Sequence, residues 1–143
     1  MEYPLLVSAC LCGERCRYDG RGGAHPKLVA LCATGQAVPV CPEVLGGLPV
    51  PRDPCEIREG DVVDKNGQSR TAEFARGAAR VLAIAVELGV SAVVFKERSP
   101  SCGVSFVYDG TFSARLVPGQ GLTTALLREN GITVISDEMF SLL

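Results

Sequence analysis

Short apolar runs alternate along the chain with longer segments in which apolar residues recur at helical spacing. The short runs have the length and composition of buried strands, and they cover residues 5–9, 37–40, 92–95 and 132–135. The longer segments predict helices over residues 26–34, 71–88 and 122–130. Strands that alternate with helices in this order are typical of a parallel sheet. We therefore expect an α/β fold, Rossmann-like, with a mostly parallel sheet and helices on both of its faces.

Residues 71–88 show the clearest helical pattern. One face carries the apolar residues Phe74, Ala78, Val81, Leu82 and Ala85. Thr71 is suited to cap the first turn, and Gly89 is suited to end the helix. This helix is expected to pack its apolar face against the rest of the protein.

Turn-forming residues mark the remaining segments. Residues 42–54 are so rich in Pro and Gly that we predict no regular element there. A small hairpin or turn is predicted within residues 61–68, which contain an Asn-Gly pair. Residues 104–108 and 111–116 predict a β-hairpin appended to the main sheet, because the Asp-Gly pair between them permits positive φ.

Composition and charge narrow the class of protein. The chain has 143 residues, of which 47% are hydrophobic and 21% charged, which is typical of one globular domain over residues 1–143. The formal net charge is -2 and the basic residues are scattered, so we expect no nucleic-acid partner. No apolar run reaches the roughly 18 residues of a membrane span, and no basic region precedes the first apolar stretch. These features predict a cytoplasmic protein with no membrane partner, and they leave the oligomeric state open.

Seven cysteines are a high number for a chain of this size. Cytosolic thiols are kept reduced and an odd number cannot pair completely, so we expect no disulfide framework. Cys10, Cys41 and Cys102 each follow a predicted strand. The carboxyl ends of parallel strands share one edge of the sheet, where such folds bind ligands. We therefore expect these three thiols to converge at that edge.

Three converging thiolates suit either zinc or an iron–sulfur cluster, because both favour soft ligands. The chain contains no C-x-x-C pair of the kind found in structural zinc sites. The local group Cys10, Cys12 and Cys16 does not match the closely spaced ligand runs of ferredoxins. A cluster held by only three cysteines would leave one iron open to bind a substrate sulfur.

Two side chains beside the expected ligands suit such chemistry. Glu43 lies two positions after Cys41, and Ser101 directly precedes Cys102. Glu43 could act as a general base on water, with Ser101 orienting that water. Glu43 could also simply cap a helix or pair with Arg52.

Several longer motifs resemble the thiouracil desulfidase family. The resemblance runs from about Leu5 to Ser136 and so covers nearly the whole chain. The motifs are VSAC at 7–10, CRYDG at 16–20, CPE at 41–43, GGLP at 46–49, PR at 51–52, KERSPSCG at 96–103 and YDG at 108–110.

The resemblance implies a 4Fe-4S cluster bound by three cysteines and a small thiolated pyrimidine, 2-thiouracil or similar, as the substrate. Sulfur would be removed without net redox change, giving uracil and sulfide. In the implied hydrolytic reaction, the thiocarbonyl sulfur binds the free iron and water attacks the carbon that carried it. Glu43 and Ser101 match the acidic and hydroxyl residues that handle this water.

Four cysteines fall within these motifs, whereas only three should bind the cluster. We expect Cys10, Cys41 and Cys102 to be the ligands because each follows a strand, with Cys16 as the rival ligand. Structural roles are expected for the remaining cysteines, Cys12, Cys32 and Cys55.

Three charged residues also fall within or beside these motifs. Asp19, Arg52 and Lys96 are expected near the same edge, where they could contact the substrate or could equally be surface or ion-paired residues.

Two other functions are alternatives to a desulfidase. The first alternative function is a sulfur-transfer enzyme for nucleoside or tRNA thiolation. The second is a non-enzymatic module that binds zinc or a cluster.

Overall fold

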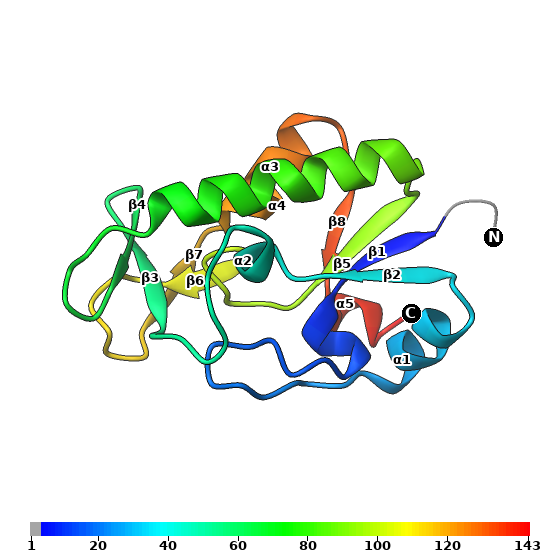
Figure 1. The fold of residues 1–143 in the computed structure, drawn as a ribbon, viewed down its shortest axis with the longest axis horizontal. Coiled ribbons are helices and arrows are strands. Elements are labelled where there is room, and N and C mark those ends of the chain that lie inside the picture. Colours follow the sequence, from blue (N-terminus) through cyan, green and yellow to red (C-terminus); the bar gives the residue numbers. More distant parts are fainter. Residues whose placement is uncertain (1–3) are drawn as a thin grey trace.

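A four-stranded parallel sheet forms the centre of the computed structural model, which describes residues 4–143 (Figure 1). Its strands are β1 (Leu5–Ser8), β2 (Ala37–Val40), β5 (Ala92–Phe95) and β8 (Val134–Ser136). They lie in the order β2-β1-β5-β8, and every neighbouring pair is parallel. The four predicted strands are therefore confirmed, although the last begins two residues later than expected.

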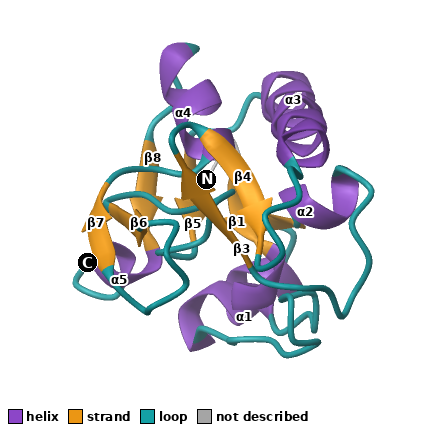
Figure 2. Ribbon diagram, turned by 90° about the vertical axis from the view of Figure 1, so that its left-hand side faces the viewer, coloured by secondary structure: helices purple, strands orange, loops and turns teal. Residues whose placement is uncertain are grey.

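Helices cover both faces of this sheet (Figure 2). α3 (Thr71–Leu88) and α4 (Leu122–Glu129) lie together on one face. α1 (Pro26–Ala33) and the unpredicted α5 (Asp137–Phe140) lie on the other face. The expected α/β fold is confirmed. Among residues 4–143 no helix combines the length and the apolar character needed to cross a membrane.

Alternate strand residues contribute to two separate cores, as the period of two in a strand requires. Leu6 and Val93 are fully buried on the side of α3 and α4. Val7 and Val94 are fully buried on the side of α1. Because both faces are covered, the strands have continuous apolar sequences rather than alternating ones.

Two antiparallel hairpins lie beyond the carboxyl ends of the central strands (Figure 1). One pairs β3 (Cys55–Arg58) with β4 (Asp61–Asp64), and β3 lies within a stretch for which no strand was predicted. The other pairs β6 (Phe106–Tyr108) with β7 (Leu116–Pro118), which confirms the predicted hairpin with a wider turn. The small hairpin or turn predicted within residues 61–68 is confirmed: β4 is followed by a turn at the Asn-Gly pair, and Ser69 then bridges back to Val63 in the antiparallel sense.

The chain after β1 and β2 continues into one-turn helices that were not predicted. η1 (Ala9–Cys12) is a 3-10 helix, and α2 (Pro42–Leu45) is a single α-helical turn. α2 packs against α3 with almost no space between the two backbones. A Cβ at Gly77 would overlap the carbonyl oxygen of Pro42, and one at Gly46 would overlap that of Glu73. Two glycines thus permit the close approach that stabilises α2.

The start of α3 also differs from the prediction. Arg70 occupies the cap position, and no side chain caps the helix. The hydroxyl of Thr71 instead accepts a hydrogen bond from the backbone N–H of Val62 at 2.9 Å and donates one to the carboxylate of Asp61. Thr71 therefore ties α3 to β4 rather than capping the helix. Gly89 ends α3 as predicted, in the left-handed conformation.

Candidate functional site

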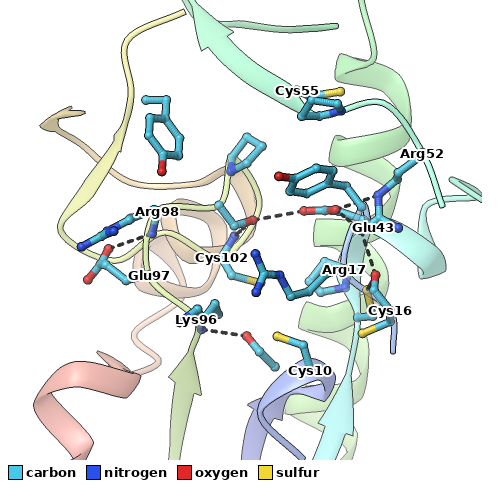
Figure 3. A pocket seen from close by; sticks show the side chains of 18 of the residues that line it. Cys10, Cys16, Arg17, Glu43, Arg52, Cys55, Lys96, Glu97, Arg98 and Cys102 are labelled. Atoms are coloured by element: carbon cyan, nitrogen blue, oxygen red, sulfur yellow. Dashed lines mark hydrogen bonds and ion pairs between the residues drawn. The ribbon is translucent and has the colours of Figure 1, made fainter. Parts of the chain in front are cut away.

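The carboxyl ends of β1, β2 and β5 open into a cavity of about 650 Å³. Residues of β3, β6 and the turn after β6 form its opposite wall. The cavity therefore lies between the sheet edge and the two hairpins, with side chains from both projecting into it (Figure 3).

All free cysteines among the described residues line this cavity: Cys10, Cys16, Cys41, Cys55 and Cys102. Cys10 lies in η1 directly after β1, Cys41 separates β2 from α2, and Cys102 lies in the turn that follows β5. The predicted convergence of these three thiols is confirmed. Cys55, which was expected to be purely structural, also reaches the cavity from the start of β3.

Cys16 and Cys41 lie side by side in the cavity wall. Their side chains share a hydrogen bond, and Cys41 Sγ lies 3.8 Å from the carbonyl oxygen of Cys16. The hydrogen bond from Cys16 lowers the pKa of Cys41 and, with burial, raises the pKa of Cys16 itself. The pair therefore favours one thiolate beside one neutral thiol.

Burial is the largest influence on the pKa of the other two strand-end thiols, Cys10 and Cys102. It raises the pKa of Cys10 to about 11 and raises the pKa of Cys102 well above its ordinary value. Such thiols are neutral without a cofactor. A soft metal centre displaces the thiol protons when it binds, so buried cysteines of this kind are suitable ligands.

The two remaining cysteines form a disulfide between Cys12 and Cys32. The expectation of no disulfide framework is therefore corrected for this pair. Cys12 ends η1 and Cys32 lies near the end of α1, and both pack against the apolar core on that face of the sheet. The two cysteines are 20 positions apart, so the sequence gives no sign that they are close in space. The bond encloses the loop that carries Cys16.

Glu43 lies in the first turn of α2 and is held at both carboxylate oxygens (Figure 3). Oε2 accepts hydrogen bonds from two guanidinium nitrogens of Arg52, with Nε at 2.9 Å. Oε1 accepts a hydrogen bond from the Ser99 hydroxyl at 3.1 Å. Arg52 is itself only 6% exposed in its side chain and also donates to the carbonyl oxygen of Cys16 at 3.0 Å. These contacts fix the orientation of the carboxylate.

Ser101 does not occupy the position expected of it. Its hydroxyl is fully buried and shares a 3.0 Å hydrogen bond with the hydroxyl of Thr123 in α4. It does not line the cavity, whereas Ser99 does. In this turn the Ser99 hydroxyl accepts hydrogen bonds from the backbone N–H groups of Ser101 and Cys102 while it faces Glu43. The hydroxyl that contacts Glu43 is therefore that of Ser99, whereas the hydroxyl of Ser101, which was expected to orient the water, faces Thr123.

The three charged residues expected near this edge of the sheet have different environments. Arg52 and Lys96 line the cavity, but each is ion-paired, Lys96 with Asp137 of α5 at 3.3 Å. Asp19 is exposed and does not line the cavity; its carboxylate accepts a hydrogen bond from the backbone N–H of Arg21. Asp19 thus takes the surface position that was one of its two expected alternatives, and a local turn uses its side chain.

Several cavity residues were not singled out from the sequence. They include two further cations and three aromatic residues: Arg17, Arg98, Tyr18, Tyr108 and Phe112. Arg17 and Tyr18 directly follow Cys16, so their place in that motif was an available signal. Phe112 had no such signal, because its place depends on how the two hairpins contact each other.

The donors in this cavity suit a cluster of several metal atoms better than a single ion. Among residues 4–143, no three His, Cys, Asp or Glu side chains surround one point closely enough to hold a single ion. A cluster of several irons makes a different demand, because each thiolate binds its own iron atom. Four free thiols from three strand ends and one adjoining loop, around a cavity of about 650 Å³, fit such a cluster.

The fold and the cavity together define an α/β protein with a thiol-lined site at the carboxyl edge of a parallel sheet. Residues 5–139 match the family described as 2-thiouracil desulfurase. The chain belongs to that family.

Two individual proteins are similar to this chain over nearly its full length. The solved structure of a [4Fe-4S]-dependent thiouracil desulfidase, TudS, is 44% identical in sequence and superposes with a TM-score of 0.93, covering 99% of this chain and 95% of that one. The uncharacterized protein YbbK of Bacillus subtilis is also 44% identical, over 93% of this chain and 95% of its own length.

Proposed function

We propose that this protein is a [4Fe-4S]-dependent desulfidase that hydrolyses a thiolated pyrimidine, such as 2-thiouracil, to uracil and sulfide. The observation that carries the proposal is the convergence of five free thiols, three of them at strand ends, on a cavity that also contains a fixed carboxylate, Glu43. The relationship to TudS, over nearly the full length of both chains, supports it. The proposal includes a cytoplasmic location, where the thiols of the cavity remain reduced and the Cys12–Cys32 pair, which lies outside the cavity, would be open to reduction.

Cys10, Cys41 and Cys102 would hold the cluster, since each extends from a strand end into the cavity. Cys16 is the alternative ligand because it adjoins Cys41. When bound through three thiolates, the cluster would supply a Lewis-acidic iron that can take up the sulfur of the substrate.

Glu43 would position water and accept its proton. Arg52 and Ser99 hold the two carboxylate oxygens in place, so a water molecule bound to this group has a defined orientation. The overall reaction adds the oxygen of one water molecule to the substrate carbon and releases the sulfur as hydrogen sulfide. No electrons are gained or lost, so no reductant is required.

The decisive experiment is anaerobic purification followed by iron and sulfide analysis and an assay with 2-thiouracil. We expect about four irons and four sulfides per chain, with release of uracil and sulfide in equal amounts. Zinc without iron would instead identify a zinc-binding module. Transfer of labelled sulfur into tRNA, without release of uracil, would identify a sulfur-transfer enzyme.

A pair of serine variants tests the role of the hydroxyl. Ser99→Ala removes the partner of Glu43 and also the acceptor of the Cys102 N–H, and we expect kcat per bound iron to fall on the order of 10²-fold. Ser101→Ala removes the bond to Thr123, and we expect reduced thermal stability with kcat close to that of the wild type. A large loss of kcat in Ser101→Ala, with Ser99→Ala fully active, would contradict this assignment.

A further inference from the structure

A buried carboxylate organises the chain immediately after Cys102. Glu97 follows Lys96 at the end of β5, and its residue is 6% exposed. Its Oε1 accepts hydrogen bonds from three consecutive backbone N–H groups, those of Val104 at 2.7 Å, Ser105 at 2.8 Å and Phe106 at 3.1 Å. One oxygen atom therefore accepts from every backbone N–H of residues 104–106, while the N–H of Gly103 donates to the carbonyl oxygen of Ser99.

These donors need Glu97, because Val104 and Ser105 lie outside any helix or strand. Val104 is buried, and its backbone N–H group would be costly to leave without a partner, whereas Ser105 and Phe106 are exposed residues whose N–H groups are only partly buried. Burial opposes ionisation of the carboxyl group, but the hydrogen bonds from these N–H groups outweigh it and lower the pKa of Glu97. The side chain is therefore an anion at neutral pH, and hydrogen bonds to an anion are stronger than neutral ones.

The other side of the turn is anchored as well. The backbone N–H of Glu97 donates to Asp137 of α5 at 3.0 Å. The Ser99 hydroxyl accepts a hydrogen bond from the N–H of Cys102 at 3.1 Å. Arg98, between these anchors, has a left-handed backbone with φ of 76°, a conformation that a non-glycine residue adopts only when its surroundings impose it. The turn is thus determined by its polar contacts rather than by regular structure.

We infer that Glu97 is a positioning residue for Cys102, which sets the turn so that the thiol faces the cavity before any cofactor binds. The inference rests on the proposed function, because Cys102 is one of the proposed cluster ligands. Without the Glu97 carboxylate, the segment after Cys102 would sample other conformations, and a cluster would lose one of its ligands more often.

Glu56 provides a matched control for this role. It is also buried, at 9% exposure, and its Oε1 accepts hydrogen bonds from the backbone N–H groups of Gly110 and Phe112 at 3.0 and 3.1 Å. Glu56→Ala therefore removes the same kind of interaction from a different turn of the same cavity. An effect seen only in Glu97→Ala cannot be due to the general loss of a buried carboxylate.

The first measurement uses the cluster-free protein, well below its melting temperature. In Glu97→Ala we expect the amides of residues 104–106 to exchange hydrogen, and Cys102 to react with iodoacetamide, about tenfold faster than in the wild type. Glu97→Gln keeps an acceptor oxygen without the charge and should lie between the two. Glu56→Ala should match the wild type at these positions. Unchanged reactivity of Cys102 in Glu97→Ala, or Glu97→Gln no better than Glu97→Ala, would overturn the inference.

The second measurement follows iron loss from the reconstituted proteins to a chelator, by the decay of cluster absorbance. We expect loss about tenfold faster in Glu97→Ala and unchanged in Glu56→Ala. Equal loss from both variants, or from Glu97→Ala and the wild type, would overturn the inference. A wild-type protein that binds no cluster would contradict the proposed function instead, and the cluster-free measurement would still decide the role of Glu97.

Discussion

The side chain of Glu43 shows how single residues prepare the cavity. Its two oxygens have different partners, a guanidinium group on one side and a hydroxyl on the other. Arg52 also contacts the carbonyl oxygen of Cys16, so one cation connects the carboxylate to the loop of a neighbouring thiol. A carboxylate held in this way is oriented before substrate enters.

Replacing Arg52 by Lys tests this orientation. A lysine keeps the positive charge but cannot donate two hydrogen bonds to Glu43 and one to Cys16 from a planar group. We expect kcat to fall on the order of 10²-fold, with the charge of the site conserved. The measurement is the steady-state rate with 2-thiouracil, normalised to iron content.

Arg70→Lys is the control for that substitution. Arg70 also pairs with a carboxylate, that of Asp64 at 3.4 Å, but its side chain is 38% exposed and does not line the thiol cavity. We expect this variant to retain wild-type activity. Equal loss of activity in both variants would show that the geometry around Glu43 is not the cause.

At the scale of residues, the sequence indicated which residue types form the site, but not the direction in which each side chain points. The motif at 96–103 contains two serines, and the one adjacent to Cys102 was predicted to face the cavity. The hydrogen bonds of the turn place Ser99 towards Glu43 and Ser101 towards α4 instead. Such a choice depends on contacts with distant segments, which spacing alone does not reveal.

At the scale of elements, strand order explains the convergence of the thiols. β1 lies between β2 and β5, so the segments that follow these three strands meet at one edge of the sheet. This arrangement was predictable, because apolar runs and helical periodicity identify the strands and the rules of parallel sheets align their ends. α2 was not predictable in the same way, because its single turn depends on its packing against α3.

Gly77→Ala tests that packing. In an exposed helix interior, replacing Gly by Ala stabilises by about 1 kcal/mol. Here a Cβ would overlap the carbonyl oxygen of Pro42, so we expect destabilisation of about 1–3 kcal/mol. Displacement of α2 should also move Glu43 and lower kcat. Chemical denaturation and the desulfidase assay provide the two measurements.

Ala79→Gly is the matched control in the same helix. Ala79 is exposed, so this change should cost about 1 kcal/mol through helix propensity alone and leave kcat unchanged. If Gly77→Ala proved more stable than the wild type, the close contact between α2 and α3 would not be the reason for this glycine.

At the scale of the whole molecule, the site is formed by two separate structural units. The parallel sheet supplies the three strand-end thiols, and the hairpins supply the opposite wall. Glu56 and Arg58 of β3 connect the hairpins, since both bind the turn after β6 at Gly110. Phe112, in that turn, lines the cavity with a left-handed φ of 58°. The contacts of Glu56 therefore determine the shape of the wall that faces the substrate.

Glu56→Ala tests whether the sheet and the hairpins have different roles, the sheet in holding the cluster and the hairpins in binding substrate. Removing the carboxylate frees the N–H groups of Gly110 and Phe112, so the turn should loosen and substrate should bind less well. We expect KM for 2-thiouracil to rise about tenfold while iron content stays at the wild-type level. Glu59→Gln, at an exposed position in the turn of the same hairpin, should change neither quantity. Loss of iron in Glu56→Ala would mean that the hairpins also support the cluster, whereas a rise in KM alone would assign the cluster to the sheet and substrate affinity to the hairpins.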